Sequence, residues 1–72
     1  MFYLIEITTY VDGTPTAKGV YGYETQTEAV ANFHSKMGGA MKNANYASEL
    51  VMVINNVGAV IASDYFARTV TE

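Results

Sequence analysis

The stretch Leu50-Val51-Met52-Val53-Ile54 decides the fold, because it is apolar at every position. Successive side chains of a β-strand point to opposite faces of the sheet, so a strand with one solvated face alternates apolar and polar residues. This stretch does not alternate. The sequence therefore predicts a strand at the centre of a sheet that is covered on both of its faces.

Two strands are expected before this one, over residues 2–11 and 17–23, and the turn residues at 12–15 should join them into a hairpin. Gly19 and Gly22 in the second strand indicate an edge position or a close backbone approach. One face of the first strand is apolar, and polar side chains interrupt the other. The apolar face is formed by Tyr3, Ile5, Ile7 and Val11, and the polar residues opposite are Glu6 and Thr8.

One helix is expected between the two pairs of strands. Thr25 and Glu28 have the spacing of a capping box, in which the threonine caps the helix and the glutamate reaches back to the cap amide. The helix should end near residues 43–45. Apolar residues follow at helical spacing and form one stripe: Ala29, Val30, Phe33, Met37, Ala40, Met41 and Ala44.

The pair Gly38-Gly39 falls inside this helix, where each glycine costs roughly 0.5–1 kcal/mol relative to alanine. Two explanations compete. The helix can break or become irregular there, or the glycines allow another backbone or a flat ligand to lie close against it.

A second hairpin completes the chain, with strands over residues 48–54 and 59–68 and a turn at 55–58. The last strand should place Val60, Ala62 and Phe66 on one face, and Ile61, Ser63 and Tyr65 on the other. The order ββαββ predicts a single α+β domain over residues 1–72, an antiparallel four-stranded sheet with the helix packed on one face.

Oligomerisation is expected to close the second face of that sheet. The 72 residues allow only a marginal core, and chains of this size often add disulfides, a metal or further subunits. The chain has no cysteine and one histidine, which excludes a disulfide framework and argues against a structural zinc site. A homo-oligomer, most simply a two-fold dimer, is therefore predicted.

Charge and composition argue against several classes of function. The net charge is −3, with four dispersed basic residues, whereas nucleic-acid binding needs a positive surface. No stretch is apolar enough to span a membrane, and no signal peptide is visible, so a cytoplasmic protein is expected. There is no phosphate loop, dinucleotide motif or metal signature, and the acidic residues are dispersed. We therefore expect no enzyme, no cofactor and no catalytic residues.

His34 is the one side chain suited to acid–base chemistry at neutral pH, although a surface histidine is the simpler interpretation. Polar and aromatic groups at the ends of elements can serve as solvated cover, or they can form a pocket at a subunit boundary. In such a pocket, tyrosine would stack on a base and a cation would hold phosphate. The candidate ligand-binding residues are Tyr21, Tyr23, His34, Lys42, Asn45, Tyr46 and Arg68.

Four short motifs resemble a group of short uncharacterised proteins from phages and prophages of gut Firmicutes. These motifs are Tyr3-Leu4-Ile5, Val20-Tyr21-Gly22-Tyr23, Thr27-Glu28-Ala29 leading to Phe33-His34, and Val51-Met52-Val53-Ile54 with the Asn56–Gly58 turn. In size, acidity and expected oligomeric state the chain is similar to small phage counter-defence proteins of the anti-Thoeris type.

That resemblance implies a non-enzymatic sponge in the cytoplasm of a host cell. Such a protein sequesters a nucleotide-derived immune signal, such as an ADP-ribose derivative, in pockets between subunits. The alternative is a protein-binding inhibitor of a host defence or replication factor.

Overall fold

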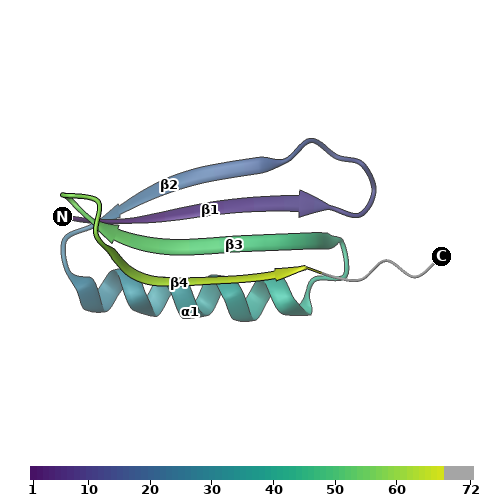
Figure 1. Cartoon of the computed structure of the whole chain (residues 1–72). Coiled ribbons are helices and arrows are strands. Elements are labelled where there is room, and N and C mark those ends of the chain that lie inside the picture. Colours follow the sequence, from purple (N-terminus) through teal and green to yellow (C-terminus); the bar gives the residue numbers. More distant parts are fainter. Residues whose placement is uncertain (68–72) are drawn as a thin grey trace.

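The computed structural model describes residues 1–67, which form one four-stranded sheet with one helix along it (Figure 1). The elements are β1 (Phe2–Tyr10), β2 (Ala17–Tyr23), α1 (Gln26–Lys42), β3 (Tyr46–Asn55) and β4 (Val60–Ala67). The predicted α+β class and ββαββ order are confirmed. Strand β1 ends one residue earlier than expected, and β3 begins two residues earlier and ends one later.

All the strand pairs of this sheet are antiparallel, and the strand order is β2-β1-β3-β4. Both predicted hairpins are present, and β1 and β3 pair at the centre. In the β1–β3 register, Leu4 lies opposite Val53 and Ile5 lies opposite Met52. The stretch Leu50–Ile54 therefore lies in an inner strand, as its two apolar faces predicted.

Helix α1 lies along one face of the sheet with its axis following the strands (Figure 1). Thr25 caps it, because its side chain accepts a hydrogen bond from the Glu28 amide, and the Thr25 hydroxyl also lies 3.1 Å from the Glu28 carboxylate. The predicted threonine cap is thus present, but the Glu28 carboxylate accepts from the Thr25 hydroxyl and not from the cap amide. The buried side of the helix is narrower than the predicted stripe, since Met41 is 52% exposed. The helix buries Ala29, Phe33, Met37 and Ala40.

The core lies between α1 and the two inner strands. Leu4, Val51 and Val53 are fully buried and pack with Phe33 and Met37 of the helix. Burying an aliphatic side chain of this size contributes roughly 1.5–3 kcal/mol. Because this core is small, each of its members is important for stability.

The apolar face of β1 turns away from the helix. Leu4 and Thr8 of β1 are buried on the helix side, whereas Tyr3 and Ile7 are more than a third exposed on the opposite side. Val11, which the sequence pattern grouped with them, lies beyond the end of β1 and is 48% exposed. The face of β1 that packs against the helix is therefore the one that carries the polar residues Glu6 and Thr8.

The predicted faces of the last strand are wrong for Val60 and Ile61. The β3–β4 register shifts between Val53 and Ile54, so that Ile54 pairs with Val60 while Val53 pairs with Ala62. This irregularity puts the 57% exposed Val60 opposite Ile54 and lets Ile61 pack against the core. An extra residue in one strand reverses which face the following side chains point to. Counting every second residue along the sequence does not take such an extra residue into account.

The glycine pair does not interrupt the helix, because α1 runs unbroken from Gln26 to Lys42. An added Cβ at Gly38 or Gly39 would meet no atom within 4 Å. Close approach by another part of the described chain is therefore not the reason for these glycines, and neither is a helix break.

Gly38→Ala and Gly39→Ala should each raise the free energy of unfolding by about 0.5–1 kcal/mol, since alanine restricts the unfolded chain and has open space in the folded one. Thermal or urea unfolding followed by circular dichroism measures the change. A loss of stability in both variants would contradict this expectation and show that something outside the described chain lies against the helix at this point.

The sheet face opposite α1 is apolar and carries no covering element within residues 1–67; we call it the open face. Its side chains form cross-strand rows, with Lys18 the one charged residue in them. From the β2 edge to the β4 edge the rows are Gly22-Tyr3-Ile54-Val60, Val20-Ile5-Met52-Ser63 and Lys18-Ile7-Leu50-Tyr65. Four strands of this length span roughly 20 Å by 25 Å. A continuous apolar patch of this area is at the upper end of the patch sizes found on monomeric proteins.

In the described part of the chain, no helix has the length and apolar character needed to cross a lipid bilayer.

Candidate functional site

The predicted ligand-binding residues do not form one cluster within the chain. Tyr23 ends β2 at the end of the sheet where α1 begins, whereas Lys42 lies at the opposite end, where α1 stops. Figure 1 shows these two ends separated by the length of the helix. His34 lies between them on α1, and Arg68 lies outside the described residues.

Three of the predicted residues lie together at the end of the sheet where α1 stops: Lys42, Asn45 and Tyr46. The short connection from α1 to β3 is held by hydrogen bonds, since the Asn45 amide donates to Asn43 Oδ1 and the Val11 amide donates to the Asn45 carbonyl. The Tyr46 ring meets Tyr10 edge to face, with 5.4 Å between the ring centroids. Burial is the main cause that raises the pKa of Tyr46. This end therefore presents an aromatic pair next to a cationic helix end.

Tyr21 belongs to a second polar group, between β2, β1 and α1. The Lys36 ammonium lies 4.4 Å from the centroid of the Tyr21 ring and 3.4 Å from Glu6 Oε1. Tyr21 pairs with Leu4 on the sheet face that α1 covers, so one lysine connects the helix to both strands. Cation–π contacts of this type contribute about 0.5–1 kcal/mol when exposed.

The most unusual polar residue of the fold is Glu49, which is fully buried. The Thr8 hydroxyl donates a hydrogen bond to its Oε1, while Oε2 receives none from any described residue. Thr8 and Glu49 lie opposite each other in the β1–β3 pair. Burial, followed by the neighbouring Glu6 carboxyl, raises the pKa of Glu49 to about 7.

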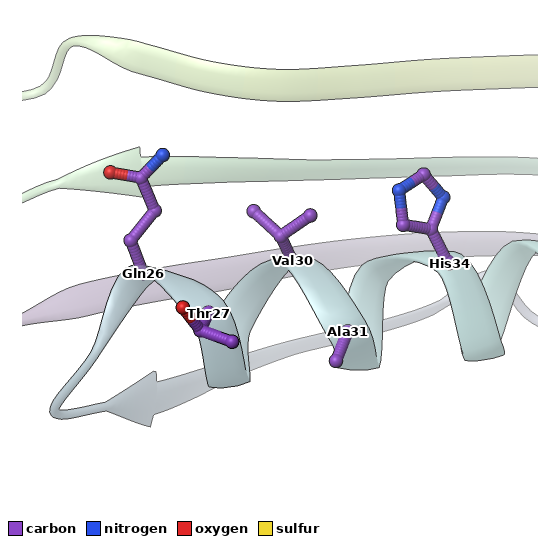
Figure 2. Close-up of a pocket in the computed structure, with 5 residues that line it drawn as sticks. All are labelled: Gln26, Thr27, Val30, Ala31 and His34. Carbon is purple, nitrogen blue, oxygen red and sulfur yellow. The ribbon is translucent and has the colours of Figure 1, made fainter.

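His34 lies beside a hollow of about 540 Å³ along α1 (Figure 2). Gln26, Val30 and His34 project from the same side of the helix, one turn apart, and Thr27 and Ala31 complete the lining. The His34 ring meets Phe33 edge to face at 5.1 Å. No acidic side chain lines this hollow, and its polar groups are the His34 imidazole, the Gln26 amide and the Thr27 hydroxyl.

Sequence reasoning missed Glu49, Glu6 and Lys36. Thr8 and Glu49 are 41 positions apart, and only the β1–β3 pairing brings them together. A weak signal existed, because Glu49 has the same parity as Val51 and Val53 and must share their face. Both faces of this strand were expected to be covered, which implied a buried carboxyl.

Within residues 1–67, no group of three or more histidine, cysteine or acidic side chains is placed to hold a metal ion. In comparisons with known proteins, no family model matches the chain, and no match was found among curated proteins or solved structures.

Proposed function

We propose that this chain is a non-catalytic binding protein that works as a homo-oligomer, most simply a two-fold dimer. The observation that carries the proposal is the open face. Tyr3, Ile7, Val20, Val60 and Tyr65 are between 36% and 66% exposed on it. Half-buried Ile5, Leu50, Met52 and Ile54 lie in the same rows.

A second copy of the chain is the occupant that this surface fits best. The open face is nearly free of charge, so it is complementary to itself and offers little to a charged partner. Stable interfaces cover about 800 Å² on each partner. The footprint of this face is roughly 500 Å² in projection, and the projecting side chains raise its accessible area above that value. Two copies packed face to face would give each sheet a second apolar layer.

The proposed activity is the capture of a nucleotide-derived immune signal, such as an ADP-ribose derivative, by a phage counter-defence protein in its host's cytoplasm. One feature supports it. The Tyr10–Tyr46 pair and the residues Lys42 and Asn45 lie at the same end of the sheet, which offers aromatic surface, a cation and an amide together.

A second candidate is a protein-binding inhibitor of a host defence or replication factor. It is favoured by the outer strands β2 and β4, which lie at the edges of the described sheet. An exposed edge can pair with an extended segment of another protein.

Native mass spectrometry of protein purified from signal-producing cells tests both candidates. A mass of two or more chains with a retained small molecule is expected. A single host protein that co-purifies without a small molecule would favour the inhibitor, and bare chains without any adduct would contradict ligand capture.

We expect saturating signal to raise the melting temperature, because a ligand at 100 times its Kd stabilises the folded state by about 2.7 kcal/mol. Tyr46→Leu and Lys42→Ala should each reduce this shift, whereas the control Ser35→Ala, at an exposed position of α1, should leave it unchanged. Differential scanning fluorimetry with an ADP-ribose derivative provides the measurement. An equal shift in all variants would exclude the Lys42–Tyr46 end as the binding site.

A further inference from the structure

Glu49 is a buried carboxyl group that the proposed function does not use. It is fully buried, and its Oε2 receives no hydrogen bond from the described residues. A buried carboxylate without partners costs several kcal/mol. The Thr8 hydroxyl satisfies Oε1 only. Something must therefore compensate the second oxygen.

The groups around Glu49 come from each of the neighbouring elements. Strand β1 contributes Glu6, which pairs with Val51 and so lies diagonally across from Glu49 on the same face. The Lys36 ammonium of α1 forms an ion pair with Glu6 at 3.4 Å and lies over the Tyr21 ring of β2. Phe66 of β4 is the apolar partner of Glu49 in the β3–β4 pair. Asp64 of β4 pairs with Val51, so it lies diagonally across from Glu49 on the other side, but it is exposed. Tyr10 and Tyr46 are also near, since Glu49 and Tyr10 both act on the pKa of Tyr46.

We propose that Glu49 and Glu6 share one proton, and that this proton makes the contact between the sheet and α1 a pH-dependent switch. In this arrangement Glu49 carries the proton on Oε2 and donates a hydrogen bond to one oxygen of the Glu6 carboxylate. The Lys36 ammonium pairs with the other oxygen of Glu6. Two ionised carboxylates have no donor between them, so a single proton converts their repulsion into a hydrogen bond. When the proton leaves to water, two negative charges face the one ammonium of Lys36.

The pKa shift of Glu49 agrees with this geometry. Burial is the main cause, and the neighbouring Glu6 carboxyl adds to it, whereas Thr8 and Lys36 act in the opposite direction. The result raises the pKa from 4.5 to about 7. The folded state holds this proton more tightly than the unfolded chain does. The proton's contribution to the free energy of unfolding is therefore complete below pH 4.5 and is lost as the pH rises to 7.

A carbon-13 NMR titration of the side-chain carboxyls tests the proposal on the unaltered protein. The Glu49 Cδ signal is expected to titrate with a midpoint near 7. A Glu49 midpoint in the ordinary glutamate range would overturn the shared proton.

Variants separate a proton switch from a merely structural role. In Glu49→Gln the amide can still donate a hydrogen bond to Glu6 but has no proton to lose. The decrease in melting temperature expected for the wild type between pH 4.5 and 7 should therefore be absent. Glu24→Gln should keep the wild-type fall. Lys36→Met should move the Glu49 midpoint upward, because Lys36 lowers the pKa of Glu49. An unchanged midpoint in Lys36→Met, or an unchanged fall in Glu49→Gln, would contradict the proposal.

Discussion

Val53→Asp is expected to leave the chain unfolded. Val53 is fully buried between β1, β4 and α1, and pairs with Leu4 and Ala62. The change removes roughly 1.5–3 kcal/mol of apolar burial and places an unpaired carboxyl in the core at a further cost of several kcal/mol. A domain of this size has a total stability of about 4–11 kcal/mol. Far-UV circular dichroism and a thermal melt measure the loss.

The adjacent residue supplies the matched control. Met52 precedes Val53 in β3 but points to the open face. Met52→Asp should therefore retain the far-UV spectrum of the folded protein and a cooperative melt. If Val53→Asp also melts cooperatively near the wild-type temperature, Val53 does not lie in the core.

Met52→Lys is expected to separate the subunits without unfolding the chain. Met52 pairs with Ile5 in the central row of the open face, so a two-fold dimer would bring two added lysines into its apolar interior. Since an unpaired buried charge costs several kcal/mol, association should weaken by at least about 100-fold. Size-exclusion chromatography with light scattering reports the change in mass.

Ser35→Lys is the control for Met52→Lys, because Ser35 is exposed on α1 and lies on the other side of the molecule. It should leave association unchanged. Dissociation in Ser35→Lys but not in Met52→Lys would move the interface to the helix.

Most of the fold could be predicted because its signals are local. Three signals each specify structure within a few residues of chain. They are the capping-box spacing of Thr25 and Glu28, the turn residues of both hairpins, and the uninterrupted apolar stretch Leu50–Ile54. The strand order could not be predicted in this way. It depends on the pairing of β1 with β3, which joins Thr8 to a residue 41 positions away.

The candidate site was less predictable for the same reason. Tyr46 and Lys42 were proposed from their places at element ends, but Tyr10, the aromatic partner of Tyr46, comes from β1. The parity of Glu49 with Val51 and Val53 indicates which face it shares, but its partner Thr8 is known only from the pairing of β1 with β3. A register irregularity reversed the faces of Val60 and Ile61, because period-two counting assumes an unbroken ladder.

Sedimentation equilibrium of the unaltered chain at micromolar concentration tests most directly whether a second copy covers the open face. The expected mass is twice the 7.8 kDa of one chain, or a higher even multiple, with a return to one chain in Met52→Lys. A wild-type mass of 7.8 kDa at that concentration would contradict the account, since the open face would then be left to solvent.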